Sequence, residues 1–157
     1  MNIKIICVGK LKEKFLQDAS KEYEKRISRF ANLEIIEIPD RKNPDISSVK
    51  LCNEVMEKEG ADILSKIKNE YVIALCIEGK NLTSEGFAEK IETLKNEGGK
   101  ITFVIGGSLG LSPKVKERAD FKLSFSDMTF PHGVARVLLT EQIYRGFKIN
   151  SGESYHK

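Results

Sequence analysis

Short apolar runs alternate with longer stretches of helical periodicity along almost the whole chain, and this alternation limits the possible folds most strongly. The strand-like runs occupy residues 3–8, 33–38, 71–77, 101–105 and 121–125. The helical stretches occupy residues 11–30, 48–68, 83–95, a short segment from Pro113, and 133–148. Strands separated by helices predict a parallel sheet, and the nearly continuous apolar run 71–77 indicates that helices cover both of its faces. The sequence therefore predicts a single α/β domain that binds ligands at the carboxyl ends of its strands.

The helical spacing also predicts which side chains face the sheet. In the first helix, Phe15, Ala19, Tyr23 and Ile27 recur every four residues and predict one buried stripe. The second helix is expected to begin after an N-cap at Ser48, which follows a polar loop over residues 41–48. Its predicted buried residues are Val55, Met56, Ile63, Leu64 and Ile67.

Composition excludes several classes of protein. No apolar run approaches the roughly 20 residues that a membrane span needs. The first apolar run leads directly into a charged helix without a small-residue cleavage site, so it is predicted to be a strand and not a signal peptide. Cys7, Cys52 and Cys76 form no CxxC pair, and the chain has only two histidines. We therefore expect a cytoplasmic protein without disulfides, bound metal or contact with membranes.

The positive charge of the chain is concentrated near its end. The net charge is +3, and residues after 112 contain eight Lys and Arg against five Asp and Glu, so the earlier residues balance. This distribution suits a polyanionic partner such as RNA, although an ordinary solvated surface explains it equally well.

The residues best suited to bind a ligand or take part in catalysis lie at three predicted strand ends. These are residues 75–79, the glycine-rich run Gly106-Gly107-Ser108-Leu109-Gly110, and residues 125–132. The glycine run matches neither of the usual nucleotide-phosphate patterns, but glycine allows a ligand to approach the backbone closely. His132 is a candidate proton handler or a helix-entry residue that bonds locally, and Arg136 follows it by one helical turn.

Several runs along the whole chain resemble a known enzyme family. They include Val8-Gly9-Lys10-Leu11-Lys12, FVIGGS at 103–108, MTFPH at 128–132 and the terminal Tyr155-His156-Lys157. In order and content these runs resemble the RlmH family of the SPOUT class, which methylates N3 of a pseudouridine in 23S ribosomal RNA. Leu109, where the family is expected to have Asn, and residues 133–135 depart from its pattern.

The resemblance implies a fold, a cofactor and partners. The C-terminal part of the domain, from about residue 72 to 157, is expected to form a trefoil knot that holds S-adenosylmethionine, although chain physics alone would favour an open, unknotted sheet. The protein is expected to be a homodimer with sites at the subunit interface, to act on 23S rRNA in assembled ribosomes, and not to bind DNA.

The resemblance also assigns residues to roles. The expected cofactor-binding residues are Leu75, Gly106, Phe125, Ser126, Asp127, Met128, Thr129 and Phe130. The expected catalytic residues are His132, Tyr155, Arg136, Arg145 and His156, with His132, Tyr155 or His156 accepting the proton and the arginines stabilising negative charge or gripping phosphate.

Other functions remain open at this point. The chain is also compatible with a SPOUT enzyme that modifies tRNA or another rRNA base. A ligand-binding α/β module would bind the cofactor without methyl transfer, and a ribosome-assembly factor would bind ribosomes but not the cofactor. Cofactor titration and methyl-transfer assays separate these alternatives.

Overall fold

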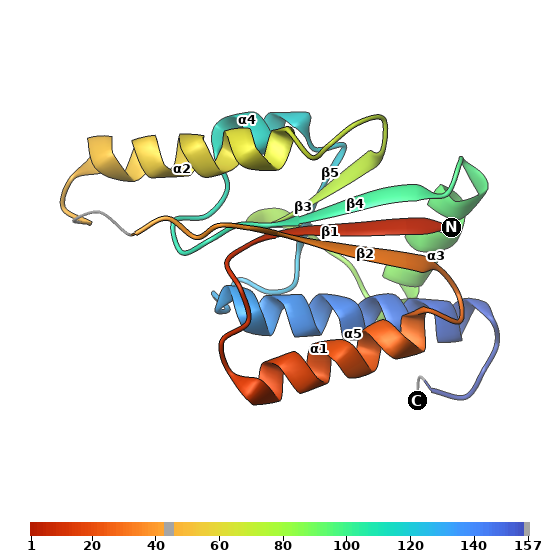
Figure 1. Ribbon diagram of the computed structural model, residues 1–157. Coiled ribbons are helices and arrows are strands. Elements are labelled where there is room, and N and C mark those ends of the chain that lie inside the picture. The colour runs from red at the N-terminus through yellow and green to blue at the C-terminus, as the bar shows by residue number, and fades with distance from the viewer. Residues whose placement is uncertain (43–45, 156–157) are drawn as a thin grey trace.

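A computed structural model describes residues 1–42 and 46–155 of the chain (Figure 1). Strands and helices alternate through this part, as the sequence predicts. The elements are β1 (Asn2–Val8), α1 (Lys14–Ile27), β2 (Asn32–Ile38), α2 (Val49–Leu64), β3 (Tyr71–Asn81), α3 (Ser84–Asn96), β4 (Lys100–Ile105), α4 (Pro113–Arg118), β5 (Phe121–Ser124) and α5 (His132–Asn150).

The strands form one parallel sheet in the order β2-β1-β4-β3-β5, which confirms the predicted α/β class. In the middle of the sheet Ile5 of β1 lies opposite Ile35 of β2 and Phe103 of β4. Because every strand runs in the same direction, all carboxyl ends meet at one edge.

Both faces of this sheet are apolar and covered by helices. Alternate residues of a strand point to opposite faces, so Ile3 and Ile5 join one core cluster while Ile6 and Val8 join the other. Helices α1, α3 and α5 pack below the sheet and α2 and α4 pack above it (Figure 1). This two-sided burial explains why the sequence of β3 reads as an almost unbroken apolar run.

The helix starts follow from local side-chain chemistry. The Ser48 and Thr83 hydroxyls accept hydrogen bonds from the backbone N–H groups of Leu51 and Gly86. The Ser112 hydroxyl does the same for Val115, and Pro113 occupies the first turn of α4, where its missing N–H costs nothing. These caps place the first turns of α2, α3 and α4 close to their predicted starts.

The predicted buried stripes are partly wrong. Along α1, Ile27 is buried as predicted and Ala19 and Tyr23 are half-buried, but Phe15 is 70% exposed. Of the five residues predicted to be buried along the second helix, Ile63 is buried and the others are half-buried. The beginning of α2 projects past the sheet in Figure 1 and has no strand beneath it, so Val49 is 71% exposed.

The two central strands send the chain to opposite faces. After β1 the chain enters α1 on one side, and after β4 it enters α4 on the other side (Figure 1). Neighbouring parallel strands with this arrangement open a crevice between their carboxyl ends, where α/β proteins commonly bind ligands. The fold therefore indicates a ligand site near the loops that follow Val8 and Ile105.

Candidate functional site

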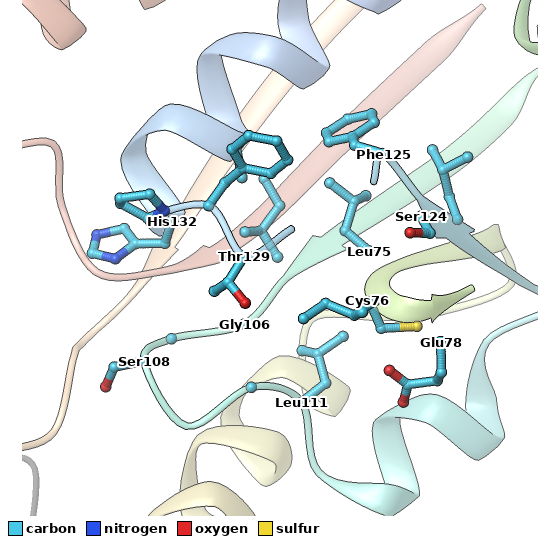
Figure 2. A pocket seen from close by; sticks show the side chains of 18 of the residues that line it. Leu75, Cys76, Glu78, Gly106, Ser108, Leu111, Ser124, Phe125, Thr129 and His132 are labelled. Carbon is cyan, nitrogen blue, oxygen red and sulfur yellow. The ribbon is translucent and has the colours of Figure 1, made fainter. Parts of the chain in front are cut away.

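A cavity of about 810 Å³ lies at the carboxyl ends of β3, β4 and β5 (Figure 2). Its walls come from three chain segments that the sequence predicted to converge. The lining residues are Leu75–Glu78, Ile105–Leu111, Lys116, Leu123–Ser126, Met128–His132 and Ala135, each range taken in full. The volume lies within the usual range for sites that bind small molecules and cofactors.

The glycine-rich turn after β4 forms the floor of this cavity. The Gly110 N–H donates to the carbonyl of Gly107 over 3.0 Å, and Gly110 has φ of +81°, a conformation that favours glycine. A Cβ atom on Gly106 would lie 2.8 Å from the carbonyl carbon of Gly110. Glycine at these positions therefore allows the tight turn and leaves its backbone accessible to a ligand.

Strand β3 supplies the second wall through an interruption in its pairing. Leu75 and Lys80 both align with Leu123 of β5, so residues 76–79 leave the sheet and return. The sequence predicted that this strand would end near residue 77, whereas it continues to Asn81. A Cβ atom on Gly79 would lie 2.6 Å from the Leu123 backbone, which explains why a residue without a side chain is required there.

One charged pair borders the cavity. Lys116 of α4 forms an ion pair and hydrogen bond with Glu78, and this contact holds the pKa of the Glu78 carboxyl below its usual range. Glu78 therefore remains an anion at neutral pH and can accept hydrogen bonds from hydroxyl or amino groups of a ligand.

The loop after β5 forms the remaining wall. The Ser124 hydroxyl donates to the carbonyl of Ser126 over 3.0 Å, and the Ser126 hydroxyl accepts from the N–H of Met128 over 3.1 Å. Phe125 and Phe130 stand between this cavity and a smaller one of about 290 Å³ beside α3 and α5. Seven of the eight predicted cofactor residues line the larger cavity, whereas Asp127 is exposed and does not line it.

His132 opens α5 at the edge of the cavity. Figure 2 shows its imidazole at one end of the group of lining side chains. The ring packs against Gly9, where φ is +89° and a Cβ atom would lie 2.9 Å from His132 Nε2. The end of β1 thus lies directly against the imidazole, a contact that no residue pattern in the sequence predicts.

Arg136 is one turn further along α5 but does not line the cavity. Its side chain is buried, and its guanidinium donates to Glu37 of β2 over 2.7 Å and to Cys7 Sγ of β1 over 3.6 Å. Burial raises the pKa of the Cys7 thiol to about 11, although Arg136 opposes the rise, so the thiol stays protonated. Arg136 thus connects the start of α5 to the first two strands.

Arg145 and Tyr155 form a separate cluster near the other end of α5. Arg145 pairs with Glu141 over 2.7 Å, and the Tyr155 hydroxyl lies 3.2 Å from the same carboxylate. The Arg145 guanidinium lies 4.8 Å from the centre of the Tyr155 ring. Thirteen residues of helix separate His132 from Arg145, which is about 20 Å at 1.5 Å per residue.

Tyr155 is a proton donor in this setting. Burial, followed by hydrogen bonding to Tyr23 and the charge of Glu141, raises the pKa of its hydroxyl to about 12. Within one chain the structure therefore does not bring Tyr155 and Arg145 to His132. His156, the last predicted catalytic residue, lies outside the described residues.

Two further observations apply to the part of the chain that the structure describes. No group of three or more His, Cys, Asp or Glu side chains there is arranged to hold a metal ion. Over the same residues, no helix combines the length and apolar character of a membrane span.

Comparison with known proteins defines the class of this protein. The family described as "Predicted SPOUT methyltransferase" matches residues 1–156, and the chain belongs to that family. The "Ribosomal RNA large subunit methyltransferase H 1" of Clostridium perfringens (strain SM101 / Type A) is 57% identical over 159 residues. The "Ribosomal RNA large subunit methyltransferase H" of Clostridium botulinum (strain Kyoto / Type A2) is also 57% identical, and both alignments cover 100% of each chain.

The fold is shared with more distant structures. The crystal structure of TrmJ from Z. mobilis ZM4 superposes with a TM-score of 0.50 at 14% identity, covering 93% of this chain and 70% of that one. At this identity the likeness concerns the fold alone.

Membership of a methyltransferase family makes S-adenosylmethionine the expected cofactor, and the cavity fits it. Because a Cβ atom on Gly106 would clash with the backbone of Gly110, glycine there permits the tight turn that brings backbone groups of residues 106–110 to the cavity wall. Leu75, Leu111 and Phe125 offer apolar surface for a flat adenine, and the Glu78 carboxylate offers an acceptor for polar groups.

Proposed function

We propose that this protein methylates N3 of a pseudouridine in the 23S rRNA of the large ribosomal subunit, using S-adenosylmethionine and acting on assembled ribosomes. The observation that carries the proposal is the full-length identity of 57% to proteins named ribosomal RNA large subunit methyltransferase H. The cavity at the carboxyl edge of the sheet, with the glycine-rich turn after β4 in its wall and His132 at the rim, supports it. A ribosomal substrate would place the reaction in the cytoplasm.

The cofactor site is proposed to lie in the C-terminal part of the domain. All described residues that line the cavity fall between positions 75 and 135, within the region expected to form the trefoil knot. Bound S-adenosylmethionine would supply a sulfonium methyl group that the ring nitrogen attacks, leaving S-adenosylhomocysteine. Leu75, Phe125 and Met128 would hold the apolar parts, and the backbone near Gly106 would hold polar groups.

His132 is proposed to accept the N3 proton of the base. An imidazole ordinarily titrates near neutral pH, and this one is held at the cavity rim by its contact with Gly9. Tyr155 is less suited to this role, because its raised pKa keeps the hydroxyl protonated. It is better suited to donate a hydrogen bond to a carbonyl of the base.

A homodimer is proposed to complete the site. Arg145 lies about 20 Å along α5 from His132, and Tyr155 packs beside Arg145, so neither can act together with His132 on the same base within one chain. In a two-fold dimer the far end of α5 from one copy can approach the cavity of the other. The Arg145 guanidinium, already oriented by Glu141, would then bind phosphate or the developing negative charge.

The test is transfer of a radiolabelled methyl group from S-adenosylmethionine to assembled ribosomes, free large subunits and naked rRNA, followed by mapping of the labelled nucleoside. N3-methylpseudouridine in 23S rRNA, formed mainly in assembled ribosomes, is the expected result. Label in tRNA or another rRNA base would overturn the substrate assignment. Cofactor binding without transfer to any RNA would overturn the catalytic one.

A further inference from the structure

An aromatic side chain at the start of α1 projects into solvent, against the expectation from the helical pattern. Phe15 is the second residue of α1 and is 70% exposed, whereas Leu16 beside it is half-buried. Exposed apolar side chains are common one by one. The exposure of Phe15 becomes significant because of the segment on which it lies.

The segment that carries Phe15 packs directly against the start of α5. A Cβ atom on Gly133 would lie 3.0 Å from Leu16 Cδ1 and 3.2 Å from Leu11 Cδ2. Gly9, at the beginning of the same segment, is in contact with the His132 imidazole. In Figure 2 the chain that follows β1 passes beside His132. Phe15 therefore belongs to the segment that contacts His132 and the start of α5, on the side of that segment which faces solvent.

The same segment carries exposed positive charge. Lys10 and Lys12 are exposed, and among the described residues neither ammonium group forms a hydrogen bond or ion pair. Lys14 has an 87% exposed side chain and lies 3.0 Å from Asp18. Glu13 is the acidic residue within this run, so three lysines within five positions leave the segment cationic.

We propose that Phe15, Lys10 and Lys12 form an RNA-contacting surface in which Phe15 stacks on an unpaired base next to the methylated one and the lysines bind the adjoining phosphates. This inference rests on the proposed RNA substrate. An enzyme that reacts with a ring nitrogen must take the base out of its stack, which leaves neighbouring bases with an uncovered face. Aromatic side chains flanked by cations are the usual platform for such bases.

Single-stranded RNA suits this surface better than a second copy of the chain. Lysine is depleted in the buried centres of protein interfaces, because its ammonium group must lose its water there. Phosphates instead neutralise the charge and release bound counterions. The positive charge around Phe15 thus favours RNA over a second copy of the chain as the partner.

The test compares Phe15→Ala, Phe15→Tyr and wild type in methyl transfer to assembled ribosomes. Loss of one stacked base is expected to raise KM for ribosomes about tenfold and leave kcat within about twofold. Phe15→Tyr should restore the wild-type KM, and the affinity for S-adenosylmethionine should not change. Val49→Ala, at a side chain that is 71% exposed on the opposite layer, is the matched control and should leave KM unchanged.

The lysines are tested through the salt dependence of ribosome binding. In the Lys10→Ala/Lys12→Ala variant, loss of two phosphate contacts should lower the slope of log affinity against log salt by about 1.4. Lys66→Ala/Lys100→Ala removes two exposed lysines near the amino ends of the strands and should leave the slope unchanged.

Direct binding of ribosomes by filter assay separates this surface from the proposed function. If the wild type binds ribosomes without methylating them and Phe15→Ala weakens binding, the surface stands and the proposed reaction fails. If methyl transfer occurs and Phe15→Ala matches the wild type in KM and in binding, the surface fails alone. If Phe15→Ala instead raises the dimer dissociation constant in sedimentation, the face is an interface between copies and the RNA assignment is overturned.

Discussion

Arg136 and Arg145 lie on the same helix and pair with carboxylates over the same distance, yet their surroundings differ completely. Arg136 is buried between α5 and the first two strands, where it pairs with Glu37 at 2.7 Å. Arg145 remains 25% exposed in its side chain and pairs with Glu141, which belongs to its own helix, also at 2.7 Å. One arginine joins distant parts of the fold, whereas the other is presented at the surface by a local partner.

This difference indicates that the two ends of α5 have different roles. The first end is fixed to β1 and β2 through Arg136 and carries His132 at the cavity rim. The far end carries Arg145 and Tyr155 around one carboxylate, away from that cavity. The comparison supports a structural role for Arg136 and is compatible with the role proposed for Arg145 in the site of a second copy.

Removal of His132 should have the largest effect on turnover, because it would remove the proposed general base. The variant tests whether the first end of α5 contains a reacting group. His132→Ala is expected to lower kcat by about 10²- to 10⁴-fold, the usual contribution of a general base. S-adenosylmethionine affinity, measured by calorimetry, should change little. Asp127→Asn, an exposed neighbour that does not line the cavity, is the control. Unchanged turnover in His132→Ala would remove this residue from the mechanism.

Arg136→Met should come next and affect stability. Loss of the buried guanidinium removes its hydrogen bond to Glu37, but this carboxylate is 31% exposed and can be hydrated, so urea unfolding should show a loss of about 2 kcal/mol. The double variant Arg136→Met/Glu37→Gln should show a similar loss, because an unpaired Glu37 carboxylate is accessible to water. A single variant that is fully stable but inactive would show that Arg136 acts on the substrate, as the sequence had suggested.

Arg145→Ala should instead spare stability. Its pair is partly exposed and local, so unfolding free energy should fall by less than about 1 kcal/mol. Turnover on ribosomes should fall roughly 30-fold if a charged hydrogen bond of about 2 kcal/mol is lost. Mixing Arg145→Ala with His132→Ala at equal amounts should restore about a quarter of wild-type activity, because hybrids of a two-fold dimer keep one intact site. No recovery on mixing would place both residues in the same chain's site.

Much of the fold could be predicted because its signals are local. Ser48 and Thr83 are caps whose partners lie three residues away, and the apolar run that begins at Tyr71 needed only its own residues to be identified as a buried strand. The return of β3 to the sheet after residue 79 could not be predicted in this way. It depends on Gly79 fitting against the backbone of Leu123, which is distant in sequence.

The cavity was predicted better than the arrangement of its catalytic residues. Loops at the carboxyl ends of parallel strands lie at the same edge of the sheet. Leu75, Gly106 and Phe125 could therefore be predicted to line one cavity. The partners of Arg136 were not predictable, because Glu37 lies 99 residues earlier and the strand order alone brings it near. Helical spacing placed Arg136 on the same side as His132 but gave no information on which side chain would be buried.

The smallest expected effect concerns the Tyr155 hydroxyl, and it tests whether the far end of α5 supplies a donor or a base. Its pKa is raised from 10.0 to about 12 by burial and by hydrogen bonding near Tyr23 and Glu141. Folding therefore favours the protonated form, so this contribution to stability is present below pH 10 and is lost as the pH rises toward 12. The melting temperatures of wild type and Tyr155→Phe should accordingly converge between pH 10 and about 12. In a spectrophotometric titration, the variant should lack the tyrosinate absorbance step that occurs at the highest pH in the wild type. Tyr23→Phe, which removes one cause of the shift, should move that titration to lower pH. A Tyr155 that titrates at its ordinary value would return the hydroxyl to consideration as the proton acceptor and would weaken the distinction between the two ends of the helix.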